Sequence, residues 1–155
     1  MKRSLSVLQR KAQPFLFLRS YLILAPIIFF IYFSLNAGLS GESLAEYLTS
    51  QPMNPVMLLI ALLSVFWFAV LSIAQNQISE KIWNWTLIVF IASNVLTGNV
   101  VAIILGVMTM KQDVELKDNK EDTVSNLPVV LTVMMSFLVL LSLFVCFAFV
   151  RLTLA

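Results

Sequence analysis

The residue types that could do chemistry are few in this chain, and they lie outside its apolar runs. The chain of 155 residues has no histidine and one cysteine, Cys146. An internal disulfide, a CxxC redox pair, a zinc site of Cys and His, and any mechanism that needs an imidazole are therefore excluded. No Asp, Glu or Lys falls inside a long apolar run. Ionisable groups at membrane depth usually mark a proton relay or an ion path. We therefore expect neither an enzyme nor a proton-coupled exporter, and no cofactor or metal.

The small and polar residues that remain at membrane depth recur most regularly in the segment 83–110, which has no charged residue. Residues four apart share a helix face. Small residues let a second helix approach closely, and an Asn side chain can hydrogen-bond across the gap. The segment is predicted to be the central packing helix of a membrane bundle. Its helix-packing interface is predicted to consist of Asn94, Gly98, Ala102 and Gly106.

Four long apolar runs dominate the composition. Of the 155 residues, 60% are hydrophobic and 12% are charged, whereas a soluble domain averages about 45–50% apolar and about 25% charged. About 20 apolar residues are needed to cross a hydrocarbon core of about 30 Å. We predict an all-α integral membrane protein, a single domain over 1–155 folded as a four-helix antiparallel transmembrane bundle. The predicted spans are about 20–36, 55–74, 83–110 and 127–150, with outer loops 37–54 and 111–126.

The first 19 residues carry five positive charges and no acidic residue. Basic residues beside a span attract anionic lipid, at about 1 kcal/mol each near the surface, and they also set topology by the positive-inside rule. Both interpretations make 1–19 a basic cytoplasmic arm. In the first interpretation, the contacts with anionic lipid are made by Lys2, Arg3, Arg10, Lys11 and Arg19.

The distribution of basic residues predicts the orientation. With four spans and an inner N-terminus, seven Lys and Arg residues lie inside and three lie outside. The positive-inside rule therefore favours N-in/C-in, and we expect a multi-pass protein of the cell membrane, in particular a bacterial cytoplasmic membrane. A break at Thr97-Gly98-Asn99 would instead make the third run a re-entrant hairpin. The count would then fall to three, and the C-terminus would move outside.

Two local signals lie at the predicted membrane surfaces. Ser43 and Glu46 have the spacing of a capping box, which predicts a short helix that ends before Pro52. This helix would lie on the membrane surface or offer a docking face to a partner. Trp83 and Trp85 follow the turn after the second span, as interfacial aromatic anchors do.

These features favour helix packing over chemistry as the basis of function. The leading hypothesis is an accessory or regulatory subunit of a larger membrane complex. Its partners would be membrane lipids and another integral membrane protein or a second copy of itself, with no nucleic acid. The alternative is a small oligomeric transporter or channel in which Asn94 and Asn99 line a polar path. A third hypothesis, an enzyme that acts on lipid, would have to use surface carboxylates such as Glu42 or Glu80.

Overall fold

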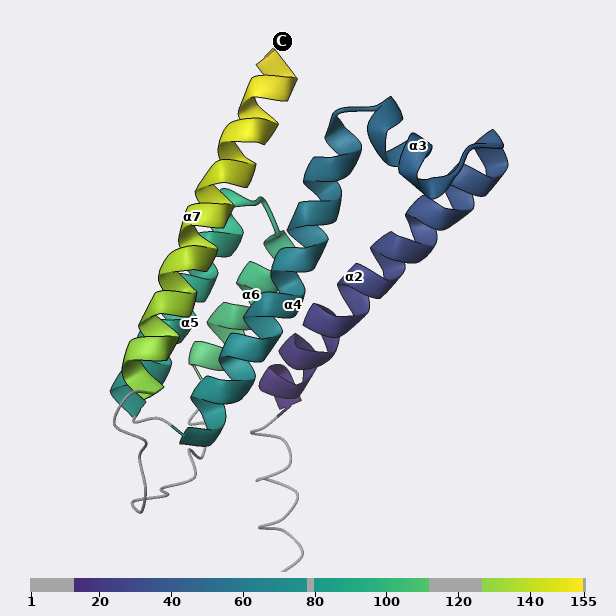
Figure 1. Cartoon of the computed structure of the whole chain (residues 1–155). Coiled ribbons are helices and arrows are strands. Elements are labelled where there is room, and N and C mark those ends of the chain that lie inside the picture. The colour runs from purple at the N-terminus through teal and green to yellow at the C-terminus, as the bar shows by residue number, and fades with distance from the viewer. Residues whose placement is uncertain (1–12, 78–79, 112–126, 155) are drawn as a thin grey trace, which may run out of the picture.

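A computed structural model describes residues 13–77, 80–111 and 127–154. This part of the chain is helical and contains no strand, which confirms the all-α class. The predicted lipid contacts Lys2, Arg3, Arg10 and Lys11, and the loop 111–126 beyond its first residue, lie outside the described residues. The helices are α2 (Gln13–Ser40), α3 (Leu44–Ser50), α4 (Met53–Gln77), α5 (Glu80–Leu96), α6 (Val100–Met110) and α7 (Leu127–Leu154) (Figure 1).

Three of these helices are long and apolar enough to cross a membrane. A helix of 28 residues, such as α2 or α7, is about 42 Å long, which exceeds a hydrocarbon core of about 30 Å. The helix α6, with 11 residues, is only about 16 Å long. The structure is thus that of a helical protein with three candidate spans and two shorter apolar helices, as in a multi-pass membrane protein. The candidate spans are Pro14–Ser40, Met53–Gln75 and Val129–Leu154.

The segment 83–110 is two helices and not the one continuous helix that the sequence predicted, so the structure does not contain the predicted single span there. The helix α5 ends at Leu96 and α6 begins at Val100. The two helices run in opposite directions and pack against each other as a helical hairpin (Figure 1). The break falls at Thr97-Gly98-Asn99, the place where the sequence allowed a re-entrant hairpin.

Two local signals explain this break. Gly98 has a φ of +69°, in the left-handed region where residues with a Cβ are strained. Its N–H donates to the carbonyl of Val95 at 3.2 Å, and the N–H of Asn99 donates to the carbonyl of Asn94 at 3.0 Å. This pair of bonds is the Schellman arrangement that ends a helix. The side-chain Oδ1 of Asn99 then accepts the N–H of Ala102 at 3.3 Å and caps the start of α6.

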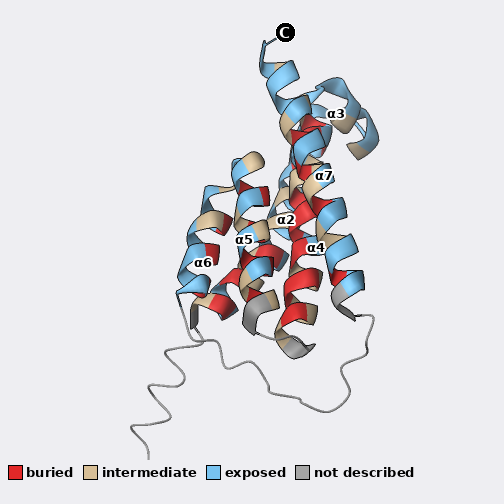
Figure 2. Ribbon diagram, turned by 90° about the vertical axis from the view of Figure 1, so that its left-hand side faces the viewer, coloured by how far each residue is buried: buried red, intermediate tan, exposed pale blue. Residues whose placement is uncertain are grey.

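The hairpin alters the relative positions of the start of α2 and the end of α7, compared with a bundle of four antiparallel spans. The start of α2 and the end of α7 are at opposite ends of the bundle (Figure 1), whereas four antiparallel spans would bring both termini to one side. The tip of the hairpin stops short of the upper ends of α2, α4 and α7 (Figure 2). The four-span count therefore becomes three long helices and one hairpin.

The central helix of the bundle is α4, and not the segment 83–110. It lies between α2 and α7 (Figure 1) and also contacts α3 and α5. In its most apolar stretch, 39% of the residues are buried inside the protein, compared with 17% in the corresponding stretches of α2 and α7. In Figure 2 the buried residues follow α4 along most of its length. The segment 83–110 does not take this central place because it is divided into two short helices, and neither of them offers one long face to α2, α4 and α7 together.

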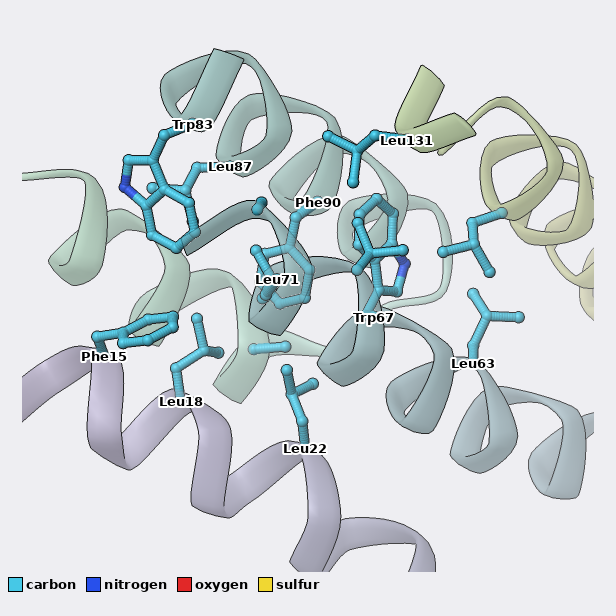
Figure 3. Packing of buried hydrophobic residues seen from close by; sticks show 14 residues of the cluster. Phe15, Leu18, Leu22, Leu63, Trp67, Leu71, Trp83, Leu87, Phe90 and Leu131 are labelled. Carbon is cyan, nitrogen blue, oxygen red and sulfur yellow. The ribbon is translucent and has the colours of Figure 1, made fainter. Parts of the chain in front are cut away.

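The core gathers at the end of the bundle where α2 begins. Side chains of α2 point toward those of α4 and α5 there, and Phe15 meets the ring of Trp83 edge-on at 5.3 Å (Figure 3). Trp83 is 3% exposed and Trp85 is 58% exposed. Residues two apart lie on nearly opposite faces of a helix, so only Trp85 has the exposure expected of an interfacial anchor. The prediction for Trp83 is wrong.

The capping box in the first loop is confirmed. Ser43 Oγ accepts the N–H of Glu46 at 3.3 Å, and the Glu46 carboxylate accepts the N–H of Ser43 at 2.8 Å. Hydrogen bonding of the Glu46 carboxylate to Ser43, through its side chain more than through its backbone N–H, lowers the pKa of the Glu46 carboxyl. This short helix, α3, links α2 to α4 at the end of the bundle opposite the start of α2 (Figure 1).

Candidate functional site

The four predicted packing residues do not form one helix face. Asn94 lies on α5, Gly98 lies in the turn, and Ala102 and Gly106 lie on α6. Asn94 donates to the carbonyl of Phe90, on its own helix, at 2.8 Å, and makes no bond across helices in the described structure. Because the chain reverses at Gly98, the four-residue period does not continue from one helix into the next.

Close packing does occur at Gly106, inside the hairpin. A Cβ placed there would lie 2.9 Å from Cγ1 of Ile91 and 3.1 Å from Cε1 of Phe90. Ala102, one turn earlier on α6, is fully buried. The small residues of α6 therefore let α6 approach α5 of the same chain. At Gly98 there is nothing within 4 Å of such a Cβ, so this glycine serves the backbone turn and not a close contact.

The tip of the hairpin is tied to α2 by one hydrogen bond. The hydroxyl of Tyr21 donates to Oδ1 of Asn99 at 2.6 Å. The same oxygen caps α6 through the N–H of Ala102. One amide oxygen thus accepts from α2 and from the first turn of α6, which fixes the height of the tip against α2.

A second set of polar contacts lies deeper and joins three helices. Nε1 of Trp67, on α4, donates to Oγ of Ser93 on α5 at 3.1 Å. Oγ of Ser93 is also hydrogen-bonded to Oγ of Ser142 on α7, and Ser142 donates to the carbonyl of Leu138 at 2.8 Å. All three side chains in this network are buried. Contacts of this kind in membranes measure about 0.6 kcal/mol each, which is enough to select the relative height of α4, α5 and α7.

A groove of about 680 Å³ lies between α5 and α7. Its walls are mostly apolar, and Trp85 and Leu140, two of the residues that form them, are strongly exposed. Ser136 and Thr132 are exposed and add two hydroxyls to a surface that is otherwise hydrophobic. The lining residues are Ile82, Trp85, Val89, Thr132, Met135, Ser136, Val139 and Leu140.

A smaller groove of about 350 Å³ lies between α2 and α4, near the start of α2. It contains Arg19, whose guanidinium carbon lies 5.2 Å from the ring centre of Phe68 and 5.9 Å from that of Phe15. The other lining residues are Leu16, Ser20, Ile23 and Gln75. Of the five predicted lipid contacts, Arg19 is the one that the described structure includes.

The described side chains do not form a cluster of metal ligands. Within residues 13–77, 80–111 and 127–154, no group of three His, Cys, Asp or Glu side chains could hold a metal ion. In the same part of the chain, one buried side-chain oxygen has no hydrogen-bond partner, Oγ of Ser72 on α4.

Sequence reasoning did not single out Tyr21, Trp67, Ser93 or Ser142 as polar contacts. A lone Ser in an apolar helix usually bonds to its own backbone, so Ser93 and Ser142 carry no signal of a partner. A single Tyr or Trp among apolar residues carries no such signal either. Asn99 did carry one, because an Asn after Gly is a typical helix start.

No protein-family model, no curated protein and no solved structure matches this chain.

Proposed function

We propose that this protein is an accessory or regulatory subunit of a larger membrane complex, and that it receives one transmembrane helix of another integral membrane protein in the groove between α5 and α7. The proposal depends chiefly on that groove. Helices in lipid associate by close packing and interhelical hydrogen bonds, because lipid tails are as apolar as the side chains. A concave surface with a hydroxyl in it supplies both kinds of interaction.

The chemistry of the groove fits a helix as its occupant. Trp85 is a wide aromatic wall on α5, and Met135 on α7 is an unbranched side chain that adapts to irregular shapes. The hydroxyl of Ser136 can donate to a carbonyl or a polar side chain of an incoming helix. An acyl chain could fill the same volume, but it has no acceptor for that hydroxyl.

The outer face of α7 continues this apolar surface. Six of its eleven exposed large apolar residues recur at alternating intervals of three and four. This spacing is the period of left-handed helix pairs, so one straight partner helix could follow the face over several turns. The residues are Val130, Val133, Phe137, Leu140, Phe144 and Phe147.

The proposed orientation is N-in with the C-terminus outside. In the described part of the chain, Arg19, Lys81 and Lys111 lie toward the end of the bundle where α2 starts, and Arg151 lies near the other end. Of the other six Lys and Arg residues, four precede α2 in the sequence and two lie between α6 and α7. The positive-inside rule favours the basic end as the cytoplasmic one. Both α3 and the end of α7 would then face the outside of a cell membrane, which we take to be the bacterial cytoplasmic membrane.

Quantitative mass spectrometry of proteins that copurify in mild detergent tests the proposal. Ser136→Trp fills the groove at an exposed position, and Ser34→Trp is the matched control on the exposed surface of α2. We expect a stoichiometric partner whose yield falls about tenfold, equivalent to about 1.4 kcal/mol, in the first variant and not in the second. The proposal would be refuted if no other protein copurified in a stoichiometric amount. It would also be refuted if Ser136→Trp and Ser34→Trp had the same effect.

A small oligomeric transporter or channel is the weaker alternative. In that mechanism Asn94 and Asn99 line a polar path, but Asn94 donates to the carbonyl of Phe90, and Asn99 accepts from Tyr21 and from the N–H of Ala102. Neither residue lines one of the two grooves. If the protein supported flux across liposomes and the double variant Asn94→Leu, Asn99→Leu abolished it, the transporter or channel mechanism would be supported.

A further inference from the structure

We propose that the groove between α2 and α4 binds the headgroup of one anionic phospholipid, with Arg19 contacting its phosphate. This site is separate from the helix-binding groove between α5 and α7, and it does not depend on the proposed subunit function.

The first argument is the placement of the Arg19 charge. Its guanidinium lies near the ring of Phe15 on its own helix and the ring of Phe68 on α4. Cation–π contacts with two rings hold a flexible side chain in place without neutralising it. In the described part of the chain Arg19 has no carboxylate partner, so its charge is available to a ligand. A guanidinium is always protonated and presents its N–H groups in a planar fork that matches two phosphate oxygens.

The second argument is the hydrogen-bonding character of the groove. Ser20 and Gln75 line it beside Arg19, and neither side chain has a hydrogen bond in the described structure. All three side chains can donate to an anion. A phosphodiester is negatively charged and its non-ester oxygens only accept hydrogen bonds, so it complements this set. A cationic headgroup would meet the positive charge of Arg19.

The third argument is the apolar part of the same groove. Leu16 and Ile23 line it one helix turn to either side of the polar residues, and both are exposed. The ligand must therefore carry hydrocarbon next to its anionic group, as a phospholipid does and a free phosphate does not. The volume of about 350 Å³ is at the lower end of ligand sites, which span roughly 300–1,000 Å³. It suits a headgroup with the beginning of one chain, and the rest of the lipid would lie along α2.

The fourth argument is depth. Arg19 is six residues, or about 9 Å, from the first residue of α2. Side chains on a helix lean toward its N-terminus, and the contact of Arg19 with Phe15, one turn earlier, agrees with this direction. The guanidinium is thus directed toward the headgroup layer at the basic end of the bundle.

Native mass spectrometry of the full chain, released from nanodiscs that contain equal amounts of phosphatidylglycerol and phosphatidylcholine, tests the site. We expect one retained phosphatidylglycerol in preference to phosphatidylcholine. Arg19→Gln should weaken its retention about tenfold, the usual scale for one hydrogen bond to a charged group. Arg151→Gln is the matched control, because it removes an exposed cation near the opposite end of the bundle, and it should change nothing.

A second variant guards against misfolding of Arg19→Gln. Ser20→Phe fills the groove from an exposed position and leaves the charge intact, and it should weaken retention as well. Equal retention of the two lipids, equal loss in Arg19→Gln and Arg151→Gln, or full retention in Ser20→Phe would each overturn the proposal. Displacement of the lipid by equimolar glycerol 3-phosphate would also overturn it, since the site would then recognise a free phosphate ester.

Discussion

Replacing Gly98 by Ala separates the hairpin from a continuous helix, because the two structures predict changes of opposite sign. In a continuous helix over 83–110, Ala is more favourable than Gly by about 0.8–1.0 kcal/mol. In the hairpin, Gly98 has a φ of +69°, and a residue with a Cβ in the left-handed region costs about 1–2 kcal/mol. A Cβ at this place has no neighbour within 4 Å, so steric overlap adds nothing. We expect Gly98→Ala to lower the free energy of unfolding by about 1 kcal/mol, or about fivefold in the equilibrium constant.

Two further variants make this measurement specific. Gly98→Asn should lose less than Gly98→Ala, since Asn enters the left-handed region more readily. Gly38→Ala is the matched control, because Gly38 lies within α2, has no positive φ, and a Cβ added there would meet nothing within 4 Å. The Gly38→Ala protein should have a free energy of unfolding about 0.5–1 kcal/mol higher than the wild type.

The assay is reversible unfolding in mixed micelles, followed by tryptophan fluorescence. Trp67 and Trp83 are 1% and 3% exposed, so their emission should report loss of the core. If Gly98→Ala proves as stabilising as Gly38→Ala, the segment is a continuous helix in the membrane and the argument from the Schellman turn is wrong.

Three other predictions concern different parts of the molecule. Gly106→Leu should destabilise the protein by about 1–3 kcal/mol through overpacking against Ile91, whereas Val101→Leu, at an exposed position, should change unfolding in the same micelles by less than about 0.5 kcal/mol. Alkaline phosphatase fused to the C-terminus should be active in cells, because the proposed orientation, which follows the positive-inside rule, puts that end outside. An inactive fusion there, together with an active fusion at the loop 111–126, would favour the four-span topology instead. The pKa of Glu46 is lowered from 4.5, so its ionised form stabilises the cap of α3 above that value, and the cap should be lost as pH falls through the lower, folded-state pKa. Hydrogen exchange at the amide of Ser43 should show this acid-side step in the wild type and not in Glu46→Gln, and a step in both would assign it to another group.

Several features could be predicted from residues close together in the chain. The lengths of the apolar runs set the helical class and the positions of the three long helices, because about 20 apolar residues are needed to span the hydrocarbon core. The capping box of Ser43 and Glu46 is a contact over three residues, and it formed as predicted. The turn at Gly98 and Asn99 was also present as a local signal. The regular spacing of small residues across this turn does not correspond to one helix face, because the chain reverses at Gly98.

Tertiary structure alone decided which faces meet. The central place of α4, the burial of Trp83 and the contact of Ser93 with Ser142 all join residues far apart in the chain. In a soluble protein, the polar face of a helix shows which side is solvated. Here lipid tails are as apolar as Leu, so the sequence alone carries little contrast between a face that meets lipid and a face that meets another helix. The two grooves, one with Trp85 and one with Arg19, exist only because packing brought particular helices together.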